Sequence, residues 1–301
     1  MRNTCKKTHR PSVATTAAAT TDGKNSPWLT HGMLLAATFF WGWTFPVVKE
    51  AVAIMPVFAF LALRFGLAAA LMLFFTRRLP PRNHLLFGGG LGVLLFLSFA
   101  FQTWGLVYTS SANSAFITGL NVVWVVLLGK NIKQAWPVVV LALIGLWLMA
   151  APEVNGLNLG DALTLICSLF ISLHLLMMAK LGAESSSSDM AFLQFFVVAA
   201  AAAGISAITE PSLLPPTWSG DIIFALLLTA LGATIFSFWV QTHFQRRTTA
   251  TRTGLIFLCE PLFAALFAAF FYGEKIPLSA ALGGALIFMA MAGAVLGWRR
   301  V

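Results

Sequence analysis

The chain has 301 residues, of which 59% are hydrophobic and only 10% are charged. A soluble globular domain carries about 25% charged residues, so this composition excludes an ordinary soluble protein and predicts a membrane protein. The net charge of +9 does not indicate a nucleic-acid partner, because the Lys and Arg residues lie in short stretches between apolar runs.

The first segment, residues 1–29, is polar, rich in Thr and Ala, and basic at Lys6, Lys7 and Arg10. It lacks the apolar core that a secretory signal requires. We therefore expect a disordered cytoplasmic tail, with an organelle transit peptide as the alternative.

Ten apolar runs follow, each close to the roughly 20 residues that a helix needs to cross the hydrocarbon core of a bilayer. Their continuity argues against a membrane β-barrel, whose strands alternate over about 10 residues. The predicted fold is an all-α integral membrane protein of ten transmembrane helices. The predicted spans are 30–50, 55–76, 84–107, 110–130, 135–152, 158–181, 189–209, 219–243, 249–272 and 276–298.

The basic residues predict how these spans are oriented, because cytoplasmic loops hold an excess of Lys and Arg. With the N-terminus in the cytoplasm, 16 of the 19 Lys and Arg residues fall on the cytoplasmic side, whereas Lys49 and Lys275 fall outside. Both termini, including the short C-terminal segment 299–301, are then cytoplasmic. We expect the bacterial cytoplasmic (inner) membrane.

The two halves of the chain contain matching residues, which indicates a duplication. Gln102-Thr103 recurs as Gln241-Thr242 at an offset of 139, and an offset of 130 pairs Thr44 with His174. Five spans per half is an odd number, so the halves insert in opposite orientations, an architecture typical of secondary transporters. The predicted five-helix repeats are 30–152 and 158–298.

Three short motifs carry a resemblance to a known family. They are Phe40-Trp41-Gly42-Trp43-Thr44-Phe45-Pro46, Ala62-Leu63-Arg64-Phe65 and Phe271-Tyr272-Gly273-Glu274-Lys275. With them the chain resembles EamA-type transporters of the drug/metabolite transporter (DMT) superfamily over residues 30–298. The resemblance implies a ten-helix fold with the substrate held between the repeats. Similarity to the amino-acid exporters of this group, including those for aromatic amino acids, implies export.

The chain departs from the family pattern after the fourth span. The Gly-Glu turn that follows span 9 should have a counterpart there, but Gly129-Lys130-Asn131 follows directly and about nine residues are absent. The expected acidic residue of the first half is missing with them.

Glu260 is an ionisable residue near the middle of span 9, where charge is costly and usually functional. At the offset of 139 it matches Asn121 in span 4. We expect Glu260 to bind a substrate ammonium group or to exchange a proton, with a structural interhelical hydrogen bond as the alternative. Pro261 and Pro46 each remove a helical hydrogen bond, which either presents backbone groups to a substrate or only kinks the helix.

Arg64 in span 2 and His174 in span 6 are the other ionisable candidates. The guanidinium fork of Arg64 suits a substrate carboxylate. Its structural alternatives are an ion pair with Glu50 or Glu260, or snorkelling toward the outer face. His174 either relays protons or makes an interhelical hydrogen bond.

Four tryptophans lie deep in spans 1, 4 and 8, which the family resemblance places around the cavity. We expect Trp43 and Trp124 to stack on a planar substrate, ahead of Trp41 and Trp239. The alternative is that these rings only fill core or lipid-facing positions. The predicted substrate-binding residues are Trp43, Thr44, Arg64, Asn121, Trp124, His174, Trp239 and Glu260.

The sequence lacks the enzyme motifs His-Glu-x-x-His and Gly-x-Ser-x-Gly, an Asp-rich prenyl-transfer motif and a cluster of inward carboxylates. It also lacks a channel filter and a ring of like charges. We expect no cofactor and no metal. The predicted function is secondary transport, most simply export of neutral or aromatic amino acids by alternating access. A drug, cation or other metabolite carrier of the same fold and a passive channel are the alternatives. The expected partners are a small-molecule substrate and the lipid bilayer, with the chain as a monomer and a homodimer as the alternative.

Overall fold

The computed structural model describes residues 27–77, 79–129, 132–150, 158–182, 185–272 and 277–296, and all regular structure in these ranges is helical. Four features of the sequence lie wholly or largely outside the described residues. They are the predicted N-terminal tail up to residue 26, the turn Gly273-Glu274-Lys275, residues 130–131 after span 4 and the C-terminal segment 299–301.

The helices follow the apolar runs in chain order. Their bounds are α1 (Pro27–Ile54), α2 (Val57–Thr76), α3 (Arg82–Tyr108), α4 (Ser111–Gly119), α5 (Asn121–Leu128), α6 (Ile132–Ala150), α7 (Leu159–Met178), α8 (Ser187–Thr209), α9 (Gly220–Leu227), the π-helix η1 (Leu228–Phe236), α10 (Ser237–Phe244), the 3₁₀ turn η2 (Gln245–Arg247), α11 (Ala250–Phe257), α12 (Glu260–Tyr272) and α13 (Leu278–Leu296).

Seven continuous or interrupted helices in the described ranges are long and apolar enough to cross a membrane. Two shorter apolar helices, Ala135–Leu148 and Leu278–Gly293, lie within α6 and α13. In a bilayer the backbone must satisfy its own hydrogen bonds, which a helix achieves within one segment. An all-helical membrane fold is confirmed, while the count of ten spans stays a prediction.

Three predicted spans are interrupted. The span predicted at 110–130 consists of α4 and α5, and the span predicted at 249–272 consists of α11 and α12. The span predicted at 219–243 contains the nine-residue π-helix η1 between α9 and α10. Long π segments are rare and recur at functional sites, so η1 marks its part of the bundle as a candidate for function.

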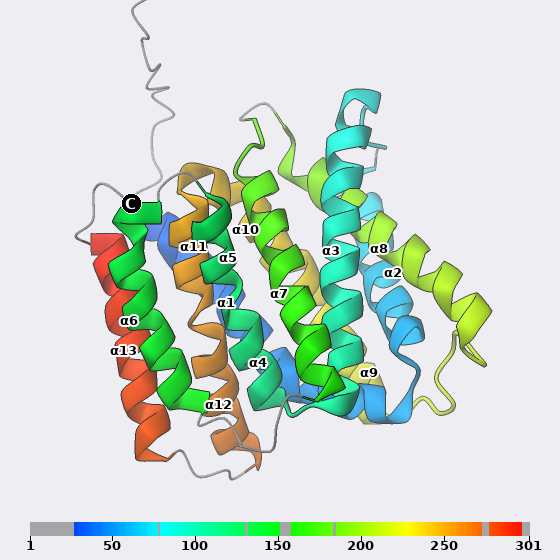
Figure 1. Cartoon of the computed structure of the whole chain (residues 1–301). Helices are drawn as coiled ribbons and strands as arrows, with labels where there is room; N and C mark the ends of the chain where they lie inside the picture. The colour runs from blue at the N-terminus through cyan, green and yellow to red at the C-terminus, as the bar shows by residue number, and fades with distance from the viewer. Residues whose placement is uncertain are drawn as a thin grey trace, which may run out of the picture.

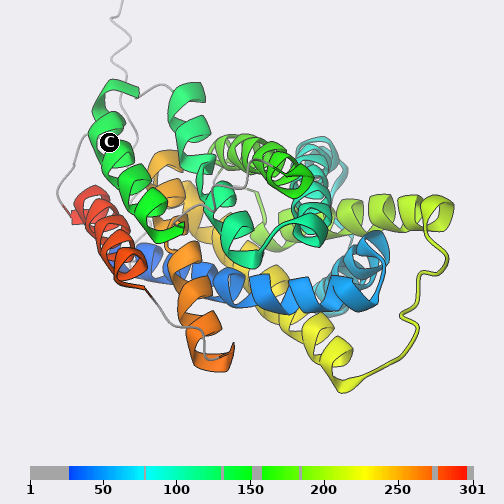
Figure 2. The same cartoon turned by 60° about the horizontal axis from the view of Figure 1, so that its bottom comes forward.

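The helices form an elongated bundle in which α6 and α13 lie side by side at one edge and α2 and α8 pack together at the other (Figures 1 and 2). Helix α1 crosses one face and contacts α10, α12 and η1. Helices α3 and α7 pack against each other between the two edges. The start of α1 and the end of α13 lie at the same end of the bundle, uppermost in Figure 1.

Close helix packing depends on glycine at a few positions. At Gly42, a Cβ atom would lie 2.6 Å from the Cβ of Phe263 and 2.8 Å from the carbonyl oxygen of Glu260. At Gly145 on α6, it would lie 2.7 Å from the carbonyl oxygen of Gly283 on α13. Small residues allow membrane helices to approach this closely, since van der Waals packing drives their association.

We predict that Gly145→Ala lowers the free energy of unfolding by about 1–3 kcal/mol, because the added methyl overpacks the contact between α6 and α13. Gly204→Ala on α8 is the matched control, since a Cβ there has no atom within 4 Å. It should be neutral or stabilise the helix by up to about 1 kcal/mol. Denaturant unfolding in detergent micelles measures both, and equal effects of the two substitutions would contradict the packing described here.

Candidate functional site

A cavity lies in the middle of the bundle, between helices from both halves of the chain. It is lined by polar residues and by a larger number of apolar ones. The lining residues are Trp41, Thr44, Phe45, Val48, Arg64, Leu95, Ser98, Phe99, Gln102, Thr103, Leu106, Asn121, Ile171, His174, Phe238, Gln241, Phe257 and Glu260. Apolar walls with a few convergent polar groups are typical of small-molecule sites.

The spans that are interrupted between α4 and α5 and between α11 and α12 meet at this cavity. Asn121 is the first residue of α5 and Glu260 is the first residue of α12, and both line the cavity. Each interruption therefore brings a helix N-terminus, with its partial positive charge, to the cavity wall. Glu260 itself is only 9% exposed. The sequence match between Asn121 and Glu260 thus corresponds to the same local geometry in both halves.

Different contacts cover the two interruptions. The Oγ of Ser172 on α7 donates a hydrogen bond to the carbonyl oxygen of Asn121 at 2.8 Å. On the other side, Gly42 of α1 packs directly against the carbonyl oxygen of Glu260. Both contacts hold the first helix of one half against the interrupted helix of the other.

Arg64 is a buried cation on the cavity wall, with 2% of its side chain exposed. Its Nε donates to Thr234 Oγ1 of the π-helix at 2.8 Å, and its guanidinium carbon lies 4.7 Å from the ring centroid of Phe99 and 5.1 Å from that of Phe65. In the described part of the chain no ion pair joins Arg64 to Glu50 or Glu260. Its burial also argues against snorkelling.

Three polar atoms on cavity-lining residues are buried without a hydrogen-bond partner in the described structure. They are Arg64 Nη2, Asn121 Oδ1 and Gln241 Oε1. An unpartnered buried polar atom costs about 1–3 kcal/mol, so three on one cavity need an explanation such as a bound polar molecule. They offer one donor and two acceptors.

His174 and Thr44 also line the cavity. The Nε2 of His174 contacts Gln194 Oε1 at 2.7 Å, and Gln194 in turn donates to the carbonyl oxygen of Met190. The Oγ1 of Thr44 donates to the carbonyl oxygen of Trp41 in its own helix. His174 on α7 therefore makes an interhelical hydrogen bond with Gln194 on α8, as the structural alternative to a proton relay predicts.

The structure places the predicted tryptophans away from the cavity lining. Trp43 stacks on Phe267 and Phe271 of α12, at centroid distances of 5.0 and 5.9 Å. Trp124 donates through Nε1 to Ser168 Oγ at 3.1 Å. Trp239 lines a different pocket, at the side of the bundle.

Trp41 is the tryptophan that lines the cavity, and its Nε1 donates to the carbonyl oxygen of Ala233 in the π-helix at 2.8 Å. Sequence reasoning ranked it below Trp43. In the sequence, Gln102 and Gln241 stand out only as matching residues of the two halves, although both line the cavity. Their matched positions in the two halves were the available signal.

Comparison with known proteins supports a transport function. The EamA-like transporter family matches residues 28–151 and 158–296. An uncharacterized transporter of Archaeoglobus fulgidus is 32% identical over 266 residues, which cover 86% of this chain and 83% of that protein. A second uncharacterized transporter of the same organism is 26% identical over 253 residues, covering 80% and 85%. One crystal structure aligns with a TM-score of 0.72 at 18% identity, covering 88% of this chain and 96% of the other, which shows a shared fold.

We predict that Thr234→Val lowers the free energy of unfolding by about 1–3 kcal/mol, because it removes the hydroxyl that satisfies the buried Arg64 Nε. In an Arg64→Met background the same substitution should cost much less, since the donor is gone. Thr209→Val is the control, because in the described part of the chain that exposed hydroxyl donates only to the carbonyl oxygen of Ile205 in its own helix. A double-mutant cycle by unfolding in detergent measures the coupling, and equal costs in both backgrounds would rule out the contact.

Proposed function

Because the chain belongs to the EamA-like transporter family, we propose that it is a secondary carrier of small zwitterionic metabolites. Neutral and aromatic amino acids are the proposed substrates, and export is the proposed direction. Transport itself agrees with the family and with the related transporters. The choice of substrate rests on the cavity.

The observation that carries this proposal is a single buried cavity with one cation and one acid that are not paired to each other. Arg64 and Glu260 both line it, and the described structure contains no ion pair between them. A zwitterion supplies a carboxylate for the guanidinium and an ammonium group for the glutamate, so that each buried charge gains a partner. The unpartnered oxygens of Asn121 and Gln241 add acceptors for the ammonium group.

The size of the cavity restricts the substrate class. Its volume of about 70 Å³ suits a small molecule. A nucleotide-sugar needs more space and would also need more buried cations than Arg64 for its phosphates.

Aromatic side chains give the cavity its apolar character. Trp41, Phe99, Phe238 and Phe257 line it together with aliphatic residues. Flat apolar groups pack well against such rings, in offset or edge-to-face arrangements. This favours large apolar side chains on the substrate over small polar ones.

The proposed mechanism is alternating access between two inverted repeats. In support, residues at matched sequence offsets line the cavity in pairs: Trp41 with Ile171, Thr44 with His174, Phe99 with Phe238, Gln102 with Gln241 and Asn121 with Glu260. The family matches the chain as two segments whose boundary falls between the predicted repeats. A site shared equally by two such repeats can open to either side when they rock about it.

The proposed membrane arrangement keeps both termini in the cytoplasm, with the bacterial inner membrane as the location. The start of α1 and the end of α13 lie at the same end of the bundle, which agrees with an even number of crossings. The basic residues of the loops favour this orientation under the positive-inside rule.

An organic-cation or drug carrier is the second candidate, because Glu260 beside aromatic rings also suits a cation. The buried Arg64 on the same wall opposes it, since a like charge in a low-dielectric cavity is unfavourable. A passive channel is the third, and saturation together with counterflow distinguishes a carrier from it.

We predict saturable counterflow of radiolabelled neutral amino acids in proteoliposomes, with aromatic ones preferred. Glu260→Gln should lower kcat/KM for these zwitterions about 10-fold or more, because it removes a charge-assisted bond to the ammonium group. Glu50→Gln is the matched control at the exposed end of α1 and should change the rate less than about twofold. Flux that does not saturate would indicate a pore, and equal rates for both variants would remove Glu260 from the site.

Substitution of two tryptophans tests the aromatic wall. Trp41→Leu should raise KM for aromatic amino acids about 5- to 10-fold relative to alanine, because one stacking surface is lost. Trp124→Leu should leave this ratio unchanged, since Trp124 does not line the cavity. The ratio of KM values is read from the same counterflow assay, and a reversed order of the two variants would contradict the assignment.

A further inference from the structure

A second pocket lies on the side of the bundle, away from the central cavity. Helix α2 contributes Met72, Phe75 and Thr76, helix α8 contributes Ser188, and the stretch from η1 to α10 contributes Ile235, Phe236 and Trp239. Its volume is about 430 Å³, and the ring of Phe75 at its rim is 74% exposed. We call it the lateral groove. None of its lining residues belongs to the central cavity.

The lateral groove lies where lipid is the surrounding solvent. Helix α2, α8 and the segment Gly220–Arg247 are each long and apolar enough to cross a membrane. Phe74, next to Phe75 on α2, is also 66% exposed. An apolar recess on such a surface accommodates a hydrocarbon chain through van der Waals packing, since lipid itself offers no hydrophobic driving force.

Trp239, on one wall of the lateral groove, begins a row of stacked and hydrogen-bonded side chains on α10 and η2. The indole of Trp239 stacks on the imidazole of His243, with centroids 5.2 Å apart and planes within 7°. The Nη2 of Arg247 contacts His243 Nε2 at 2.9 Å, and Arg247 also lies over the ring of Phe244. Trp239, His243 and Arg247 are four residues apart, so these contacts lead from the groove to the exposed Arg247.

The other wall ends at a second arginine. Thr76 is the last residue of α2, and Arg77 follows it in the left-handed conformation with φ of 53°. A non-glycine residue with positive φ is uncommon. It turns the exposed Arg77 away from the helix direction immediately beside the groove. Both cations thus follow residues that line the groove: Arg77 comes directly after Thr76, and Arg247 comes eight residues after Trp239.

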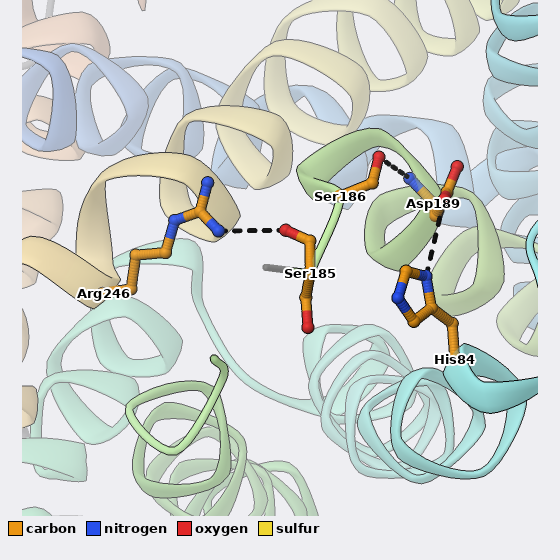
Figure 3. A network of polar contacts seen from close by, with 5 residues as sticks. All are labelled: His84, Ser185, Ser186, Asp189 and Arg246. Carbon is orange, nitrogen blue, oxygen red and sulfur yellow. Dashed lines mark hydrogen bonds and ion pairs between the residues drawn. The ribbon is translucent and has the colours of Figure 1, made fainter. Parts of the chain in front are cut away.

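An acid on the neighbouring helix α8 makes its described contacts within the bundle. Asp189 of α8 is 2% exposed, and its Oδ2 contacts His84 Nδ1 of α3 at 3.4 Å, while its backbone N–H donates to Ser186 Oγ (Figure 3). Arg246 donates to the carbonyl oxygen of Ser185 in the same network. The network braces the start of α8, and Asp189 is turned toward α3.

We propose that the lateral groove binds one acyl chain of an anionic phospholipid whose headgroup is held by Arg77 and Arg247. The apolar groove supplies affinity for the chain, and the two arginines at one end supply selectivity for a negatively charged headgroup. Basic residues next to a membrane attract anionic lipid by about 1 kcal/mol each, and arginine binds phosphate through its planar fork. The site shares no lining residue with the substrate cavity, so a test of lipid binding does not depend on the proposed transport function.

The test is lipid binding to the full chain in detergent, followed by native mass spectrometry, with phosphatidylglycerol and phosphatidylcholine of identical acyl chains as probes. The wild type should bind phosphatidylglycerol more tightly, by about fivefold for each arginine. The double variant Arg77→Gln/Arg247→Gln should lose this preference while it still binds phosphatidylcholine. Lys180→Gln, another exposed cation after α7, should keep the preference.

A substitution inside the groove tests the acyl chain. Thr76→Trp fills the groove and should weaken binding of both lipids, and gel filtration shows whether the variant remains folded. Equal binding of the two lipids by the wild type, or an unchanged preference in the double arginine variant, would overturn the proposal. A change from dimer to monomer with Thr76→Trp, without any change in lipid binding, would assign the groove to contact between two copies and would equally overturn it.

Discussion

The architecture depends on one constraint, namely that a backbone inside the hydrocarbon layer must satisfy its own hydrogen bonds. Two helices of this protein are interrupted in the middle of the bundle, after Gly119 and after Phe257. Free N–H and C=O groups at such points are tolerated only where protein or a polar cavity receives them. Both interruptions lie at the central cavity, and the first residues beyond them, Asn121 and Glu260, line it. Fold and candidate site are therefore consequences of the same requirement.

The two interruptions are equivalent in position but not in chemistry. A hydroxyl of Ser172 covers the carbonyl of Asn121, whereas the backbone of Gly42 covers that of Glu260. One wall thus carries a neutral amide and the other an acid. The proposed repeats would place equivalent backbones on the two walls, but their side chains differ. This difference suits a zwitterionic substrate, whose two ends carry opposite charges. In the proposed duplication, the repeats would supply the cavity, and divergence of single residues would supply the polarity.

Much of this arrangement could be predicted from the sequence. Apolar runs located the helices, and the offset of 139 paired Asn121 with Glu260. The π-helix was not predictable, because its residues are as apolar as any other span. Trp41 and Trp43 are two residues apart and point to different faces of α1. A helix that is apolar all round carries no pattern that reveals its rotation, so sequence alone could not tell which of the two indoles faces the cavity.

Arg64 connects the site to the proposed mechanism. A guanidinium that is 2% exposed is held by one hydroxyl and two aromatic faces, with Nη2 unpartnered in the described structure. Aromatic faces and a hydroxyl stabilise a cation less than a carboxylate does in a low-dielectric environment. A bound carboxylate would therefore stabilise this compact arrangement more than an open one in which water solvates the arginine. A ligand shifts a conformational equilibrium only through such a difference in affinity, and here the difference would favour closure of the proposed repeats around an occupied site.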